Sequence, residues 1–111
     1  MSVEITWLGH NCWTIVAGGQ TILLDPCLDD APAATVKSET VAADCILISH
    51  GHFDHIADAG KIAARTGATV VTNFEIAEWL KKQGINESQV VGMNLGGMVQ
   101  QPFGRVKMTI A

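Results

Sequence analysis

The chain of 111 residues has the length of one ordinary domain, with 48% hydrophobic and 16% charged residues. This composition supports a packed core and excludes an intrinsically disordered chain. The formal net charge is −4, and Lys and Arg form no cluster, so we expect neither a nucleic acid nor an anionic membrane as partner. Residues 1–4 carry no basic segment and lead into no long apolar stretch, which predicts neither a signal peptide nor a membrane span.

The cysteines indicate the redox compartment. There are three, Cys12, Cys27 and Cys45, at irregular spacing and without a CxxC pair. The pattern does not support a zinc ribbon or a thioredoxin-like motif. We interpret all three as small buried hydrophobic residues in a reducing compartment, which predicts a cytoplasmic protein.

The first quarter of the chain has the pattern of β-strands. Strands are predicted at residues 3–8, 12–17 and 21–24. Gly18 and Gly19 between two apolar runs favour a two-residue hairpin turn, since glycine readily adopts a positive φ. Pro26 after Asp25 ends the third strand, because proline has no N–H for the sheet.

The middle of the chain combines a loop with one short, fully apolar strand. Residues 27–43 have the composition of a loop, with a short helical turn at most. Residues 45–48 form a continuous apolar run, which is typical of a strand buried on both faces. This run leads directly into the polar segment 49–55.

The second half alternates between helices and strands. Ile56, Ala59 and Ile62 share one helical face, and Gly67 stands where a helix-ending glycine is expected. Asn73 is a suitable N-cap for a second amphipathic helix. That helix is predicted at 74–83, and strands at 69–72, 90–91, 98–100 and 106–110. The order of elements predicts the α/β class, with a mixed β-sheet and flanking helices.

The segment after the buried strand carries the candidate chemistry. It contains three of the four histidines and an aspartate in the pattern HxHxDH, residues 50–55. In an extended segment, residues two apart point to the same side, so His50 and His52 can present two imidazoles to one ion. Asp54 continues the same face, and His55 joins it if a helix begins near Asp54. Two neighbouring metal ions suit this donor set better than one.

Imidazole and carboxylate ligands without thiolate favour zinc, with manganese or iron as alternatives. Two such ions would lower the pKa of a bridging water and provide hydroxide for attack on a carbonyl or phosphoryl centre. Asp54 is also our candidate catalytic residue. The alternative interpretation is a surface histidine cluster or a polar turn. The position of the motif at the C-terminal end of a buried strand favours the metal site.

The chain also resembles a known family. The segment Ser49-His50-Gly51-His52-Phe53-Asp54-His55 resembles the signature of the metallo-β-lactamase superfamily. The opening residues 6–13 (TWLGHNCW) and residues 22–26 (ILLDP) are similar to a group of metal-dependent hydrolases related to the ascorbate-6-phosphate lactonase. The resemblance implies an αββα sandwich with a dinuclear metal site at one edge. It also implies that residues 1–111 are an incomplete domain, the N-terminal half of this sandwich.

By this resemblance, His50 and His52 would bind the first metal ion, and Asp54 and His55 the second. The family pattern further needs a third histidine after a strand such as 106–110, and later a bridging aspartate and a last histidine. Residues 1–111 contain none of these three. The chain would therefore supply half of the ligands, with two for each ion, whereas a catalytic zinc usually has three.

The resemblance also assigns roles near the metal site. Asp25 matches an early aspartate that supports the metal-binding segment by hydrogen bonding; alternatively, it is a turn residue before Pro26. His10 is expected to face the site, although a structural histidine is an equally plain interpretation. Trp7, Trp13 and Phe53 are expected to be packing residues rather than substrate contacts.

These expectations define the predicted function. The chain is expected to be part of a metal-dependent hydrolase for a small ester, lactone or phosphoester, with weak metal binding and little or no activity alone. An apolar sheet face should lie exposed, which calls for a homo-oligomer or a C-terminal half that completes the sandwich. Two alternatives remain: a non-catalytic metal-binding or interaction domain, and a di-iron redox member of the same superfamily.

Overall fold

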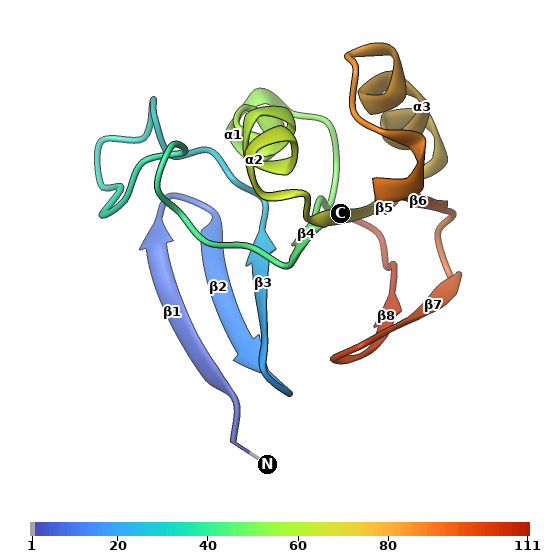
Figure 1. The fold of residues 1–111 in the computed structure, drawn as a ribbon, viewed down its shortest axis with the longest axis horizontal. Helices are drawn as coiled ribbons and strands as arrows, with labels where there is room; N and C mark the ends of the chain where they lie inside the picture. Colours follow the sequence, from blue (N-terminus) through green and yellow to red (C-terminus); the bar gives the residue numbers. More distant parts are fainter. Residues whose placement is uncertain (1) are drawn as a thin grey trace.

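The computed structural model describes residues 2–111, which form a six-stranded mixed sheet and a separate two-stranded hairpin (Figure 1). The strand order follows the chain, β1-β2-β3-β4-β5-β6. The antiparallel part consists of β1 (Glu4–Gly9), β2 (Cys12–Ala17) and β3 (Gln20–Leu24). The parallel part consists of β4 (Cys45–Leu47), β5 (Thr69–Asn73) and β6 (Val90–Met93). The predicted α/β class with a mixed sheet is confirmed.

Two tight turns connect the antiparallel strands. Gly18 and Gly19 form the predicted two-residue turn between β2 and β3, with φ values of 57° and 74°. The turn between β1 and β2 contains Gly9 at φ 120° and His10 at φ 52°. Since a non-glycine residue rarely adopts a positive φ, this second turn carries backbone strain at His10.

The helix predicted to begin near Asp54 does begin there, but it is broken in two. α1 (Phe53–Ile56) ends before Asp58, and α2 (Ala59–Thr66) follows it. The break has a physical cause, because the buried Asp58 turns to the loop after β3. Its backbone N–H donates to Pro26 O at 3.0 Å, and its carboxylate accepts from the N–H of Leu28 at 2.6 Å. That loop, residues 25–44, consists of turns without a helix.

The second predicted helix is found as α3 (Phe74–Lys82). Asn73 caps it as expected, since its side chain accepts a hydrogen bond from Ile76 N at 2.8 Å. A short 3₁₀ helix, Glu87–Gln89, precedes β6 and was not anticipated from the sequence. α2 is amphipathic and buries Ile62, and α3 buries Leu80.

The main core lies between the sheet and the helices, which cover one face of it (Figure 1). Fully buried side chains from three strands meet fully buried side chains from two helices and the 25–44 loop. They are Leu23, Ile46, Val70, Ile62, Leu80 and Leu28.

The hairpin covers part of the opposite sheet face. It consists of β7 (Met98–Gln101) and β8 (Gly104–Lys107). Val99 and Val106 of the hairpin pack against Val71 and Met93 of the sheet. The strand predicted at 106–110 therefore ends early, at Lys107. Beyond it Met108 runs alongside Gly96 and Gly97, to which it makes two backbone hydrogen bonds.

The rest of that face, over β1 and β2, is uncovered. Trp7 pairs with Trp13 across the two strands, and Ile5 lies on the same face. The exposed fractions of Ile5, Trp7 and Trp13 are 62%, 49% and 39%. The two tryptophans were expected to be packing residues, and the described chain covers them only in part. Phe53, at the start of α1, is also exposed.

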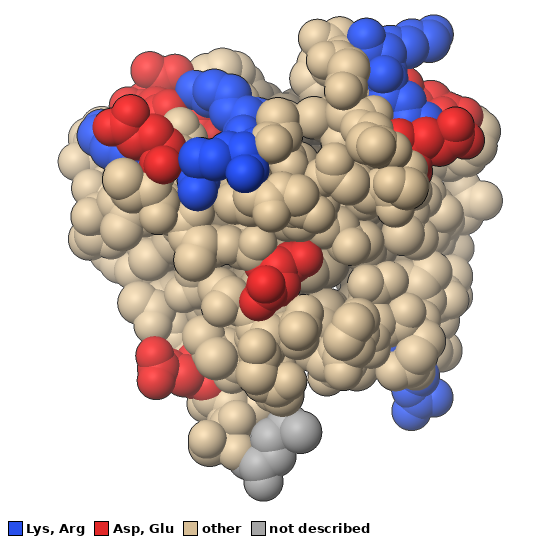
Figure 2. Space-filling view, viewed as in Figure 1, with Lys and Arg blue, Asp and Glu red and all other residues tan. Residues whose placement is uncertain are grey.

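Charged side chains are unevenly distributed over the surface. In Figure 2 they gather over the helices and the neighbouring loops, while the lower part of this face is largely uncharged. Within residues 2–111, no helix combines the length and the apolar character needed to cross a membrane.

Candidate metal centre

The parallel pairing of β3 with β4 brings two polar segments to one edge of the sheet. Leu24 pairs with Leu47, so the residues that follow the two strands leave the sheet side by side. Asp25 follows β3 directly, and its N–H donates to Leu47 O at 2.9 Å. Ser49 comes two residues after β4 and begins the segment that carries the predicted metal ligands.

Asp25 is the buried anchor of this edge. Its exposed fraction is 5%, and its φ of 45° lies in the left-handed region that Asp tolerates better than most residues. One carboxylate oxygen accepts from Ser49 N at 2.7 Å, and the other from Ser49 Oγ at 2.6 Å. The second oxygen also lies 2.7 Å from His55 Nδ1.

These contacts orient two imidazole rings. A carboxylate only accepts hydrogen bonds, so His55 Nδ1 carries the proton and Nε2 of the neutral ring keeps its lone pair. The Ser49 hydroxyl donates its hydrogen bond to Asp25. Its oxygen therefore accepts a hydrogen bond from His50 Nδ1, 2.9 Å away. His50 Nε2 consequently also keeps its lone pair. The buried carboxylate thus leaves the outer nitrogens of both rings available to a metal.

Two pairs of potential ligand atoms result. His50 Nε2 lies 3.1 Å from His52 Nδ1, and His55 Nε2 lies 3.8 Å from Asp54 Oδ2. The rings of His50 and His55 bring the pairs together, with centroids 4.0 Å apart. Ligands about 2.0–2.1 Å from a tetrahedral ion lie roughly 3.4 Å from each other. Both separations are therefore close to what shared coordination requires.

By distance alone, a different set of three residues could also bind a metal ion. Potential ligand atoms of Asp25, His50 and His55 all lie within 4.8 Å of one another. Asp25 is the less suitable ligand of the three, because its two oxygens already accept from Ser49 N, Ser49 Oγ and His55. Its contacts are those of a residue that orients ligands.

The β1–β2 turn contributes two further side chains. His10 Nε2 lies 2.9 Å from Asp54 Oδ2, and this hydrogen bond is the main cause of a lowered pKa of Asp54. Asn11 Nδ2 lies 3.1 Å from His55 Nε2 and 3.5 Å from Asp54 Oδ2. Asn11 was missed in the sequence; the only available signal was its place beside His10.

Close backbone packing holds this turn against the 25–44 loop. A Cβ on Gly9 would lie 2.7 Å from Ala34 Cα, so only glycine fits there. Thr35 N donates to Leu8 O at 3.0 Å, and the Trp7 indole N–H donates to His10 O at 2.9 Å. The turn is therefore tied on both sides while His10 points towards Asp54.

The structure brings all six predicted site residues to this edge. They are His10, Asp25, His50, His52, Asp54 and His55. Asp25 and His55 lie deeper, with 7% and 18% of their side chains exposed, whereas His10 and Asp54 are nearly half exposed. The centre therefore opens to solvent on the side of His10 and Asp54.

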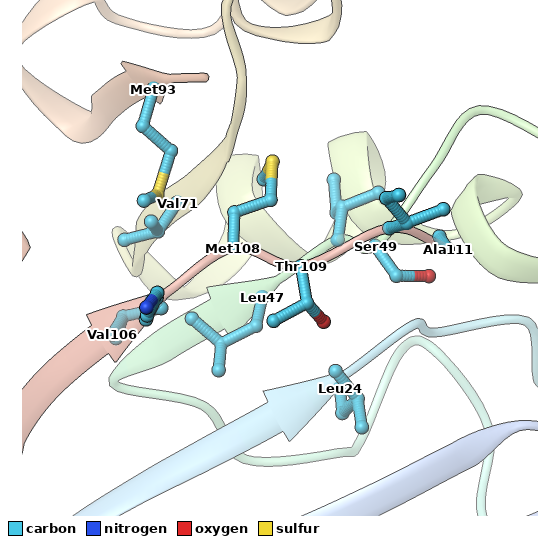
Figure 3. Close-up of a pocket in the computed structure, with 12 residues that line it drawn as sticks. Leu24, Leu47, Ser49, Val71, Met93, Val106, Met108, Thr109 and Ala111 are labelled. Atoms are coloured by element: carbon cyan, nitrogen blue, oxygen red, sulfur yellow. The ribbon is translucent and has the colours of Figure 1, made fainter. Parts of the chain in front are cut away.

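An apolar cavity of about 220 Å³ is lined in part by Ser49 (Figure 3). Leu24, Leu47 and Val71 of the sheet form one side of it, and residues 106–111 form the other. Ser49 and Ala111 lie close to each other at one end of the cavity (Figure 3). The C-terminal segment of the described chain thus runs towards the metal-binding edge.

The match to known proteins covers most of the chain. The family model described as the beta-lactamase superfamily domain matches residues 4–101. A metal-dependent hydrolase of Thermoplasma volcanium is 45% identical over 111 residues, which are 100% of this chain and 48% of that protein. A metal-dependent hydrolase of Methylacidiphilum infernorum is 46% identical over 105 residues, 94% of this chain and 46% of that protein. The chain thus spans about half the length of the curated relatives it matches.

Solved structures show the same fold. The metallo hydrolase Igni18 of Ignicoccus hospitalis superposes with a TM-score of 0.77 at 32% identity, over 88% of this chain and 42% of that chain. The chemotaxis sensor ODP, solved as a peroxy diiron species, superposes with a TM-score of 0.65 at 22% identity, over 92% of this chain and 46% of that chain. Together with the family match, these findings show that the chain belongs to the metallo-β-lactamase superfamily, within the beta-lactamase superfamily domain family.

Proposed function

We propose that this chain is the first part of a metal-dependent hydrolase that acts on a small ester, lactone or phosphoester. The main observation behind the proposal is that two pairs of potential metal ligands lie at one edge of the sheet. His50 and His52 form one pair, and Asp54 and His55 form the other. Both pairs open to solvent at the end of a buried strand, where loops of α/β proteins commonly bind ligands. The names of the two relatives, both metal-dependent hydrolases, support this reading.

The residues fit two divalent ions. His50 Nε2 and His52 Nδ1 would hold the first ion, and Asp54 and His55 Nε2 the second. Nitrogen and oxygen donors without thiolate favour zinc, while manganese or iron would also accept this set. When bound, two such ions would supply hydroxide near neutral pH and stabilise negative charge on a substrate oxygen.

Three protein residues would orient the ligands and act in the reaction. Asp25 holds both ligand rings through Ser49 and His55, so that their outer nitrogens do not have to reorganise. Asp54 is the residue that we assign as catalytic, because its carboxylate is 47% exposed and faces the open side. His10 holds that carboxylate ionised and in place through a 2.9 Å hydrogen bond.

The ligand set within residues 1–111 would be incomplete. Each ion would have two protein ligands, whereas catalytic zinc sites usually have three plus water. We therefore propose that the domain extends beyond these residues, because the chain spans 48% of the length of its T. volcanium relative. Alone, the chain should bind metal weakly and hydrolyse little.

The uncovered sheet face indicates where the rest would bind. Ile5, Trp7 and Trp13 form an exposed apolar surface beside the β7–β8 hairpin, which already covers the neighbouring strands. We propose that a C-terminal half packs there and completes a sandwich, with a homo-oligomer as the competing arrangement. The proposed location is the cytoplasm, a reducing compartment in which buried thiols stay unpaired.

Native mass spectrometry of the protein purified from its natural source tests these proposals together. A chain of about twice this length with two bound ions supports the hydrolase. Two copies of a 111-residue chain with bound metal would show that a homodimer, rather than a C-terminal half, completes the sandwich. A single 111-residue chain without metal or partner would overturn the proposal.

A non-catalytic metal-binding or interaction domain is the second candidate. Two observations favour it: two ligands per ion and a large exposed apolar surface. The two candidates differ in turnover. The full-length, zinc-loaded protein should hydrolyse p-nitrophenyl acetate or bis-p-nitrophenyl phosphate, and His50→Ala should lose that activity. Metal binding without any turnover of esters, lactones or phosphoesters would instead favour the second candidate.

A further inference from the structure

The side-chain amide of Asn11 borders the second pair of ligand atoms. Asn11 Nδ2 lies 3.1 Å from His55 Nε2 and 3.5 Å from Asp54 Oδ2. The side chain comes from the β1–β2 turn, more than forty residues away in sequence. It is partly buried.

The orientation of this amide follows from its neighbours. The Asp54 carboxylate only accepts hydrogen bonds, and His55 Nε2 is an acceptor because His55 Nδ1 donates to Asp25. The NH₂ group of Asn11, rather than its carbonyl oxygen, therefore faces both atoms. A donor 3.1 Å from one ligand atom and 3.5 Å from the other borders the position at which their shared ion would bind.

The conformation of the turn does not require asparagine at this position. Asparagine is common in turns because it tolerates a positive φ, but here Gly9 and His10 adopt the positive φ values. Within residues 2–111, the hydrogen bonds of the Asn11 side chain go to Asp54 and His55 and not to the turn backbone. Its contacts are with the metal-binding residues alone.

We propose that Asn11 is a substrate-contacting residue whose amide N–H donates to the carbonyl or phosphoryl oxygen of the substrate. This inference rests on the proposed hydrolase function. As hydroxide adds to a carbonyl carbon, the π electrons of the C=O bond move onto that oxygen. The neutral amide stabilises this charge without competing for the metal. When the carbonyl re-forms, the bond to the leaving oxygen breaks, and that oxygen leaves with the electron pair and takes a proton from water.

The turn is suited to this task because it is held rigidly. Gly9 packs against the backbone of Ala34, and Trp7 Nε1 donates to His10 O. A donor that is fixed before the substrate arrives does not have to reorganise as charge develops. In the same turn His10, the residue before Asn11, has the strained φ of 52°.

Binding of inorganic phosphate to the zinc-loaded full-length protein tests this inference without relying on turnover. Isothermal titration gives two affinities, first for zinc and then for phosphate, in the wild type, in Asn11→Ala and in the control Asn94→Ala. Asn94 is an exposed residue after β6 whose side chain does not reach the metal centre. Asn11→Ala should bind zinc within about twofold of the wild type but phosphate about tenfold more weakly, the effect of one hydrogen bond to a charged group. The control should match the wild type in both.

A second readout is the side-chain NH₂ signal of Asn11 in ¹H–¹⁵N NMR spectra, identified by its loss in Asn11→Ala. This signal should shift when phosphate is added to the zinc-loaded wild type. Asn11→Leu, which has a similar size but neither a donor nor a charge, replaces the alanine variant if that variant does not fold.

The outcomes separate this inference from the proposed function. If zinc binds but Asn11→Ala binds phosphate as the wild type does, or the NH₂ signal does not move, Asn11 is not a substrate contact and the hydrolase proposal stands. If zinc binds and the wild type binds no phosphate, the inference is likewise wrong. If the wild type binds no zinc at the histidines, the proposed function fails and this inference with it.

Discussion

Asp25 Oδ2 lies 2.7 Å from His55 Nδ1, and the same carboxylate reaches His50 through the hydroxyl of Ser49. One buried side chain thus sets the protonated nitrogen of two imidazoles that belong to different ligand pairs. Both rings are thereby oriented before any ion arrives. The metal affinity of the centre should depend on a residue that does not touch the metal.

Asp25→Asn tests this dependence. Asparagine tolerates the φ of 45° at this position but cannot accept as many hydrogen bonds, so the two rings lose their common anchor. We expect zinc affinity to fall about 10- to 100-fold, the usual effect of removing a residue that orients ligands. Isothermal titration measures it, with the exposed Asp30→Asn as the charge-matched control. Equal affinities would make Asp25 a turn residue only.

The double variant His50→Ala with His52→Ala should lose zinc at the first position and keep its fold. Neither side chain belongs to the buried core, and both lie in the segment between β4 and α1. The melting temperature in EDTA should therefore stay within a few degrees of the wild type, while the rise on adding zinc becomes smaller. A large drop of the melting temperature in EDTA would show that the histidines are structural.

Gly9→Ala should destabilise the chain more than Gly19→Ala does. Both positions have a positive φ, but a Cβ at Gly9 would lie 2.7 Å from Ala34 Cα, whereas a Cβ at Gly19 meets no atom within 4 Å. Urea unfolding should show a cost of about 1 kcal/mol for the strain at Gly19. Gly9→Ala should cost clearly more, because the backbone around Ala34 must move. Similar costs would show that the β1–β2 turn has room to shift.

Asp29 should contribute a pH-dependent part of the stability. Hydrogen bonds from Lys61, at 2.8 Å, and from Ser38 hold its pKa below the usual value of a carboxyl group. A lowered pKa in the folded state stabilises the fold above the unfolded value of about 3.9, and this contribution is lost as the pH falls below it. Urea unfolding at pH 6 should therefore show Asp29→Asn as less stable than the wild type. The difference should shrink towards pH 3, and a constant difference would contradict the assignment.

The buried thiols should be unreactive in the folded protein. Burial raises the pKa of Cys12 and of Cys45 to about 12. At pH 8 the thiolate fraction is then about 10⁻⁴, and labelling with DTNB should require the chain to open. Native protein should react slowly at these two cysteines, and the rate should rise with urea in step with unfolding. Rapid labelling without urea would show that these thiols are accessible.

The sequence allowed much of the chain to be predicted where the signal is local. The hairpin at Gly18 and Gly19 and the cap at Asn73 depend on residues within a few positions of one another, and both are found. The helix that begins near Asp54 was expected to be continuous, but it is broken, because Asp58 bonds to a loop thirty residues away in the chain. The partial exposure of Trp7 and Trp13 could not be predicted, since composition does not tell which side of a sheet is covered.

For the metal centre, the sequence by itself determined the donor set. His50, His52, Asp54 and His55 adjoin in the chain, so any fold that ends a strand before them exposes them together. Only the tertiary structure decided the contacts that orient these donors. Parallel pairing of β3 with β4 places Asp25 beside Ser49 and His55, and the β1–β2 turn carries Asn11 to the same atoms. Sequence periodicity reports which way a side chain points from its own element, whereas the partner it meets depends on how distant elements pack.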